Sequence, residues 1–363
     1  MSETEIRTRP NHLRTALVIV TAALMVEAVV LSVRLAGELR DDPVDVLEVG
    51  KTLPLDASPY GTEQTVLLPG SEVTVSVADP TDALDHDLVS YDFDDPRSSR
   101  YRDLHAPKGG SLVPVTWRIR AIGGFGREND PNPIEIRLAA GDQRVTVDSV
   151  KLEDPSDTLD ALDPQFVVIA LRGKLAPDDL RIEVEYDGLT QVVDVASGTI
   201  DAGAAQALYE PQRHYDAGCA EVEDDCNVVA ARPGQALLPA GAGFTASYLT
   251  LYPYDSDLGW ADEGSLWAGV LLQMFGGYAE DRAGNSFYIT RQSGPLFTLD
   301  GRRAVHRQRL NGGRSTTSGR VVFRVDVDAA PRELAFRQVF TLAEGAGTLS
   351  VRARLPLRPV DGN

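Results

Sequence analysis

The stretch that decides the fold is residues 180–195, which read LRIEVEYDGLTQVVDV. In its first half, Ile182, Val184 and Tyr186 alternate with charged residues, so the apolar side chains of an extended chain share one face. The Asp-Gly pair at 187–188 is typical of a tight hairpin turn, and a second partly apolar run follows it. The stretch therefore predicts two antiparallel strands of a sheet with one buried and one solvated face.

Short runs of similar character continue along the chain beyond residue 42. They are alternating or wholly apolar, and Gly, Pro, Asp or Asn bound each of them. They include residues 72–78, 112–122, 134–138, 166–171, 249–251, 266–275, 286–291, 321–327 and 334–342. No convincing long amphipathic helix lies between them. The pattern predicts an all-β chain built from antiparallel sandwiches.

The two halves of the chain match each other at a constant offset of 154 residues. Gly110-Ser111-Leu112 recurs at 264–266, and Val-Val, Ala-Pro and Leu recur in the same order within 167–180 and 321–334. Several ungapped matches at one offset indicate a duplication. We therefore expect two copies of one sandwich, each with its own core, at residues 44–200 and 235–360.

Residues 201–234, rich in Ala, Asp, Glu and Gly, are the predicted linker between the copies. Cys219 and Cys226 lie within it, and outside the reducing cytosol such a pair forms a disulfide. Closing so short a loop gains about 2–3 kcal/mol in the chain-entropy model, so the disulfide would staple a local turn. Metal binding by the two thiols is the alternative, but no histidine–cysteine cluster accompanies them.

The N-terminal part contains one candidate membrane span. Residues 15–33 read TALVIVTAALMVEAVVLSV, and as a helix they would be about 28 Å long, close to the thickness of the hydrocarbon core of a bilayer. A cleaved signal peptide is the rival interpretation, but a good cleavage site is lacking. Arg7, Arg9 and Arg14 precede the run and place the N-terminus inside. We expect an uncleaved signal anchor, a cytoplasmic tail of residues 1–14, and extracytoplasmic C-terminal domains.

Glu27 interrupts this apolar run. A carboxylate in a membrane helix costs about 2.5–3.5 kcal/mol near the centre on insertion scales, which motivates a contact with a partner inside the membrane. In the alternative interpretation Glu27 is protonated or reaches the outer interface. The sequence leaves both open.

The net charge of −19 is unevenly distributed. Residues 41–281 carry 44 acidic and 16 basic residues, whereas residues 282–363 carry 14 arginines and six acidic residues. The overall acidity argues against nucleic acid as a partner, since phosphate contacts need concentrated positive charge. The basic end is instead expected to meet the acidic part of the protein, a protein partner or an anionic envelope polymer.

Arg303, Arg307 and Arg309 are the candidate residues for such a surface. In one continuous strand they would share a face, where their guanidinium groups could bind phosphate or carboxylate. The alternative is that they solubilise an exposed strand or dock onto the first copy.

The sequence gives no sign of catalysis. The Gly-x-Ser-x-Gly, His-Glu-x-x-His and phosphate-loop motifs are absent, and the five histidines lack ligand spacing. Carboxylates gather between Asp79 and Asp95, where calcium is conceivable, but the glycine of an EF-hand loop is missing and dense Asp is typical of a solvated loop. We expect no enzymatic activity, no cofactor and no metal.

The span followed by sandwich units, and residues 312–342 (GGRSTTSGRVVFRVDVDAAPRELAFRQVFTL) above all, resemble the immunoglobulin-like extracellular domains of membrane-anchored Gram-positive and actinobacterial envelope proteins. The resemblance covers mainly the second copy. It implies two tandem immunoglobulin-like β-sandwiches and a binding or scaffolding role in the cell envelope. The competing function is an accessory subunit of a membrane complex, recruited through the helix; an extracytoplasmic hydrolase has less support.

Overall fold

The computed structural model describes residues 46–57, 61–89, 103–122, 132–151, 163–218, 230–231, 238–240, 243–275, 278–308, 316–343 and 346–360. These residues form strands and three short 3-10 helices, η1 (His86–Leu88), η2 (Pro177–Asp179) and η3 (Gly203–Leu208). For the described residues, the prediction of an all-β fold is confirmed. No helix within these ranges is long and apolar enough to span a membrane; the predicted anchor, with Glu27, lies outside them.

The first unit (residues 46–201) contains two five-stranded antiparallel sheets. One sheet has the order β1-β9-β6-β3-β2, with β1 (Thr52–Pro54), β2 (Thr62–Leu68), β3 (Ser71–Val77), β6 (Gly110–Ala121) and β9 (Gln165–Arg172). The other has the order β12-β11-β10-β7-β8, with β7 (Ile134–Ala140), β8 (Gln143–Val150), β10 (Leu180–Tyr186), β11 (Leu189–Asp194) and β12 (Ile200–Asp201). Apolar residues of both sheets, Val113 and Ile182 among them, pack into one core.

The hairpin predicted from residues 180–195 is confirmed as β10 and β11. Ile182 and Val184 are fully buried, and Glu183 between them lies on the outer face. The turn residues Asp187 and Gly188 have φ angles of 47° and 77°. Positive φ at both central positions is what a two-residue hairpin turn of this twist requires, and Asp-Gly tolerates it.

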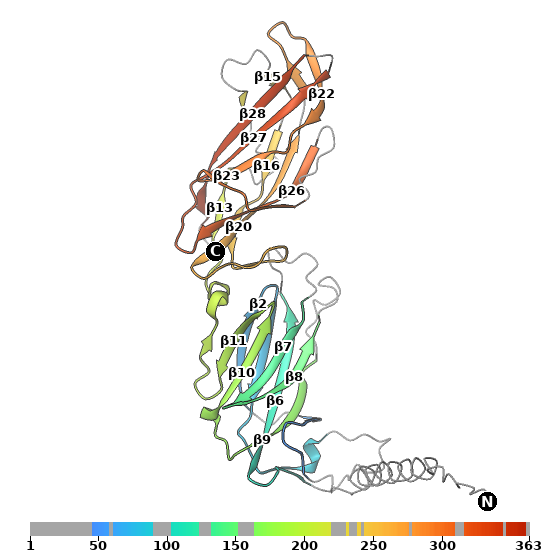
Figure 1. Ribbon diagram of the computed structural model, residues 1–363, viewed down its shortest axis with the longest axis vertical. Helices are drawn as coiled ribbons and strands as arrows, with labels where there is room; N and C mark the ends of the chain where they lie inside the picture. The colour runs from blue at the N-terminus through green and yellow to red at the C-terminus, as the bar shows by residue number, and fades with distance from the viewer. Residues whose placement is uncertain are drawn as a thin grey trace, which may run out of the picture.

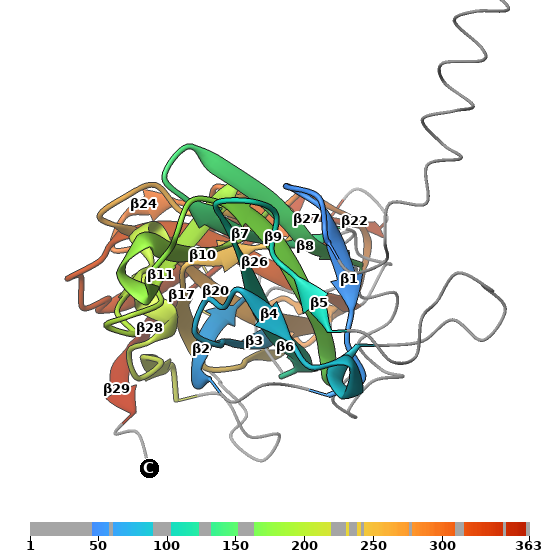
Figure 2. The ribbon, with the colours of Figure 1, turned by 90° about the horizontal axis from the view of Figure 1, so that it is seen from below.

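A smaller layer covers the outer face of the sheet that contains β6 and β9. It consists of β4 (Ala83–Leu84), η1 and β5 (Leu104–His105), which belong to the connection between β3 and β6. Leu84 and Leu104 pack there against Leu112 and Val168, which point away from the main core. Figure 2, the view from below, shows β4 and β5 beside β6 and β9.

The second unit (residues 214–360) repeats the plan with larger sheets. The seven-stranded sheet contains β13 (His214–Asp216), β16 (Gly243–Ala246), β17 (Leu249–Tyr252), β20 (Ser265–Phe275), β25 (His306–Gln308), β26 (Thr316–Asp326) and β29 (Arg358–Val360). The eight-stranded sheet contains β14 (Ala230–Ala231), β15 (Leu238–Ala240), β21 (Tyr278–Glu280), β22 (Ser286–Gln292), β23 (Leu296–Leu299), β24 (Arg302–Arg303), β27 (Glu333–Leu342) and β28 (Thr348–Pro356). A core that includes Phe297 and Phe323 lies between them. Figure 1 shows the two units end to end.

Part of the predicted linker, residues 201–234, is therefore β-structure. Strand β13 pairs with β17 and β29, and β14 pairs with β28, so both belong to sheets of the second unit. The expectation that the second sandwich begins at residue 235 is wrong, because the chain joins a sheet of that unit at His214. Cys219 and Cys226 lie outside the described residues.

The offset of 154 residues holds for some strands and fails by one residue for others. Ile169 of β9 corresponds to Phe323 of β26, and both face the core of their unit. Ile169 pairs with Val113, however, whereas Phe323 pairs with Ala268, and these partners are 155 residues apart. Because a shift of one residue reverses the face of a strand, the Gly-Ser-Leu match at 154 aligns residues that point in opposite directions.

Candidate functional site: an arginine face on the second unit

Two of the predicted arginines of the second unit, Arg303 and Arg307, do not lie on one strand. Arg303 belongs to β24 and pairs through β23 with the eight-stranded sheet, whereas Arg307 belongs to β25 in the seven-stranded sheet. The chain changes sheets between them, so the expectation of a shared strand face is wrong. Arg307 donates a hydrogen bond to the carbonyl oxygen of Pro295 at 2.6 Å. Arg309 lies outside the described residues.

Arg303 instead joins other arginines on the outer face of the eight-stranded sheet. Arg337 of β27 pairs directly with Arg352 of β28. In the neighbouring row, Arg303, Thr298, Ala335 and Arg354 follow one another across β24, β23, β27 and β28. All four arginines are exposed. We call Arg303, Arg337, Arg352 and Arg354 the arginine face; Figure 1 shows β27 and β28 side by side along the second unit.

Strand geometry sets the spacing of these charges. The Cβ atoms of the directly opposed Arg337 and Arg352 lie about 5 Å apart, and Arg352 and Arg354 are separated by about 7 Å along β28. Arg303 lies three strands from Arg354, or about 14 Å. Between Arg303 and Arg354 the sheet surface carries only the small side chains of Thr298 and Ala335.

Little negative charge balances this face. Glu333 is 4.0 Å from Arg354, and both side chains are exposed. Among the described residues, no carboxylate forms an ion pair with Arg303, Arg337 or Arg352. Like charges directly opposite each other on a sheet are destabilising, so the Arg337–Arg352 pair carries a cost that nothing in the described surroundings relieves.

The corresponding face of the first unit is balanced. Arg137 lies 2.5 Å from Glu135 and 2.7 Å from Glu185, Arg144 lies 3.0 Å from Glu183, and Arg181 lies 2.9 Å from Asp194. Hydrogen bonds from Arg137 hold the pKa of Glu135 below its ordinary value, and bonds to Glu135 and Glu185 raise the pKa of Arg137. The pKa of Asp194 is lowered, chiefly by hydrogen bonds from Ser197.

The contrast between the units centres on one position. Leu180 and Ile182 in β10 match Leu334 and Phe336 in β27 at the offset of 154, and all four face a core. Glu183 and Arg337 are therefore equivalent, and both point outward. The first unit has a glutamate there, next to arginines that it neutralises, and the second unit has a fourth arginine.

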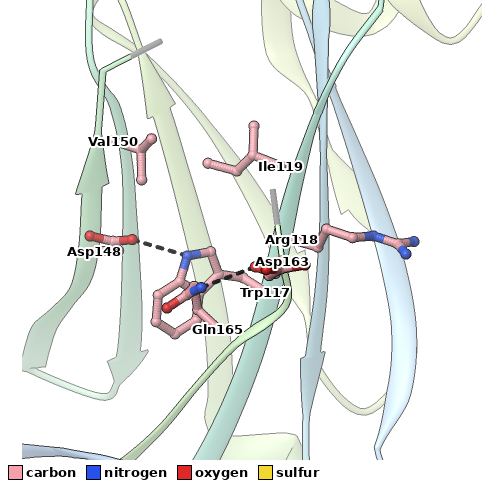
Figure 3. A pocket seen from close by; sticks show the side chains of 7 residues that line it. All are labelled: Trp117, Arg118, Ile119, Asp148, Val150, Asp163 and Gln165. Atoms are coloured by element: carbon pink, nitrogen blue, oxygen red, sulfur yellow. Dashed lines mark hydrogen bonds between the residues drawn. The ribbon is translucent and has the colours of Figure 1, made fainter. Parts of the chain in front are cut away.

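A cavity of about 350 Å³ opens at the edge of the first unit beside β8. It is lined by Trp117, Arg118, Ile119, Asp148, Val150, Asp163 and Gln165, and Figure 3 shows the guanidinium end of Arg118 directed away from the other six side chains. The indole N–H of Trp117 donates to Asp148 at 3.1 Å, and the Gln165 amide donates to the Asp163 carbonyl oxygen at 3.1 Å. The indole of Trp117 and the side-chain amide of Gln165 are thus already bonded to acceptors of the cavity itself.

The acidic stretch that suggested calcium contains a different arrangement. Nδ1 of His86 lies 3.0 Å from Asp85 and 3.5 Å from Asp103, and Nε2 lies 3.1 Å from Asp87. Ligand atoms of Asp85, His86 and Asp103 lie within 4.8 Å of one another. Calcium prefers six to eight oxygen ligands, so an exposed group centred on an imidazole does not favour it.

The two units meet through the connection between β17 and β20. Its hairpin, β18 (Tyr254–Asp255) and β19 (Gly259–Trp260), places Tyr254 and Trp260 against the core of the first unit. The ring centroid of Tyr186 lies 5.3 Å from that of Tyr254 and 6.4 Å from that of Trp260. The Trp260 indole also donates to the Tyr186 carbonyl oxygen at 2.9 Å. We call this hairpin the plug.

A buried ion pair holds the plug to its own unit. Arg320 of β26 donates to both carboxylate oxygens of Asp255 at 2.8 and 3.2 Å, and to Asp257 at 3.0 Å. Asp255 is fully buried and Arg320 is 6% exposed. The hydroxyl of Tyr252 donates to Asp255 at 2.8 Å, and burial, together with the Asp255 charge, raises the pKa of Tyr252. The plug is therefore fixed at its base by charge and at its tip by aromatic packing.

The connecting chain between the units is bonded to both. The hydroxyl of Tyr209 accepts from the Leu67 amide at 3.0 Å and donates to the Gln191 side chain at 2.8 Å. The guanidinium of Arg213 donates to the carbonyl oxygens of Val327 and Ala329. These contacts fix the connection on either side of the junction.

Sequence reasoning identified Arg303 but missed Arg337, Arg352 and Arg354. The alternation Arg-Ala-Arg at 352–354 was a usable signal, since it puts two arginines on one face of a strand. Comparison with known proteins supplies no further residues: no family model matches the chain, and no curated protein matches it.

Proposed function

We propose that this protein is a single-pass, membrane-anchored binding or scaffolding protein of the bacterial cell envelope, built from two tandem immunoglobulin-like sandwiches. The apolar run at 15–33 with its preceding arginines supports the anchor and the orientation. Two pairs of facing antiparallel sheets, each around its own core, support the immunoglobulin-like fold.

The observation that carries this proposal is the plugged junction. Units joined by a free linker move independently, whereas here Tyr254 and Trp260 complete the core of the neighbouring unit. The Arg320–Asp255 pair and the bonds of Tyr209 stiffen the same junction. A stiff two-unit body suits a protein that holds a binding surface at a set distance from its anchor.

Affinity capture from detergent-solubilised membranes tests the proposal. The full chain is compared with residues 41–363, which retain every described residue but lack the predicted anchor. Envelope components retained by both forms are the expected result, because the binding surfaces lie in the two units. Components retained by the full chain alone, and released by Glu27→Leu, would instead assign the protein to a membrane complex as an accessory subunit.

A further inference from the structure

The arginine face contains an unfavourable contact between two arginines, which the first unit lacks at the equivalent position. Arg337 opposes Arg352 on the following strand, whereas the equivalent Glu183 opposes Val192 on the following strand and Arg137 on β7, and it binds Arg144. A glutamate at position 337 would remove the repulsion without touching the core, since the side chain is exposed. The protein keeps this repulsion between arginines although a single substitution would remove it. This suggests that a bound anion is the missing partner of these charges.

We propose that the arginine face binds a linear polymer that carries repeated phosphate groups. Arginines whose Cβ atoms lie about 5 to 7 Å apart can share one anion that has several oxygens. A phosphate group has such oxygens, whereas a carboxylate has two and is saturated by one bidentate arginine. The Arg337, Arg352 and Arg354 cluster therefore fits phosphate better than carboxylate.

The breadth of the face selects a chain over a single ion. One phosphate bridges Arg337 and Arg352, but Arg303 and Arg354 are about 14 Å apart across the sheet. Thr298 and Ala335 form a low surface between them, over which an extended polymer can lie. Consecutive phosphate groups can then meet successive arginines.

The acidity of the whole chain argues against phosphate contacts over its surface in general, but it does not oppose binding at a face where positive charge is concentrated. Charges more than about 8–10 Å apart in water are largely screened at physiological salt, so the local face matters more than the net charge. On the first unit, Glu135, Glu183 and Asp194 are already paired with arginines of their own sheet. The inference names the ligand of the proposed binding protein, yet it does not require the membrane anchor.

The test is binding of fluorescent long-chain inorganic polyphosphate to the purified full-length protein in detergent, followed by anisotropy. The triple variant Arg337→Gln, Arg352→Gln, Arg354→Gln removes the cluster. A matched control, Arg120→Gln, Arg172→Gln, Arg282→Gln, removes equal charge at exposed positions elsewhere. We expect the affinity to fall at least about tenfold in the first variant and less than about twofold in the second.

Tripolyphosphate and polyglutamate of matched charge serve as competitors. Displacement by unlabelled long polyphosphate, with at least about tenfold weaker displacement by the other two, supports the proposal. Equal losses in the two triple variants, equal competition by polyglutamate, or no binding by the wild type would overturn it. Equal competition by tripolyphosphate would overturn the claim that the ligand is a long polymer. The single variant Arg352→Glu repeats the binding test with a different substitution and should also bind more weakly than the wild type. A thermal melt checks that this variant is folded. Since purified protein is used, failure here leaves capture from membranes as a separate result.

Discussion

Replacing Arg337 with glutamate is expected to stabilise the second unit, although the substitution changes only an exposed side chain. The substitution installs the residue that the first unit has at the equivalent position, Glu183. It converts the opposed Arg337–Arg352 pair into an attractive pair, flanked on the same face by Arg354. Surface electrostatics usually contribute little, so the sign of the effect is as informative as its size.

The size follows from the cross-strand geometry. An opposite-charge pair contributes roughly 0.2–1 kcal/mol relative to alanines, and a like-charge pair costs a similar amount. The exchange is therefore worth about 1 kcal/mol at low salt, which for a unit of this size shifts Tm by about 3 °C. Because the side chains are exposed, salt of about 0.5 M should remove most of the gain.

Thermal unfolding of wild type and variant at low and high salt measures this directly. The mirror substitution Glu183→Arg in the first unit is the matched control. It removes the partner of Arg144 and opposes an arginine to Arg137, so it should lower stability. An unchanged or lower Tm for Arg337→Glu, or a gain that persists at high salt, would refute the assignment of Arg337 and Arg352 as a repelling pair.

Further predictions concern the junction and the buried charges. Trp260→Ala removes the aromatic contact and the hydrogen bond to Tyr186, so calorimetry should resolve two unfolding transitions; one unchanged transition would contradict the role of the plug. Asp255→Asn removes the buried charge partner of Arg320 and leaves only the more exposed Asp257, so it should cost about 3–5 kcal/mol in urea unfolding, whereas Asp257→Asn should cost less. Because Arg137 lowers the pKa of Glu135, the ionised Glu135 stabilises the folded state above its ordinary pKa of 4.5. This stability is lost as the pH falls from 4.5 through the lowered pKa. Glu135→Gln should therefore reduce the acid sensitivity of unfolding, and identical pH profiles would exclude that source.

The sequence predicts well what depends on local alternation. Residues 180–195 form the expected hairpin because a period of two assigns each side chain to a face, and Asp-Gly supplies the turn. The same reasoning failed at Arg303 and Arg307, because the chain changes sheets between them. Such a crossing depends on what the strand can pair with, which the local pattern does not encode.

The contacts that define the candidate site arise from distant pairing. Arg337 meets Arg352 only through the register of β27 and β28, and no local motif predicts which residues oppose each other. Asp255 and Arg320 are 65 residues apart, and the plug residue Trp260 completes a core that belongs to the other unit. Even the duplication misleads by one residue at β6 and β20, where a single shift reverses the strand face.

The salt dependence of polyphosphate binding tests the central claim most directly. If the arginine face neutralises phosphates, log K plotted against log salt concentration should have a slope of roughly −2 to −3 for the wild type, since each neutralised phosphate contributes roughly −0.7 to −0.9. Removal of Arg337, Arg352 and Arg354 should reduce the slope to roughly −0.7 to −0.9, the contribution of the remaining Arg303, while removal of Arg120, Arg172 and Arg282 should leave it unchanged. An equal slope in wild type and in the face variant would contradict the account, because the arginines that neutralise the phosphates and release their counterions would then lie elsewhere.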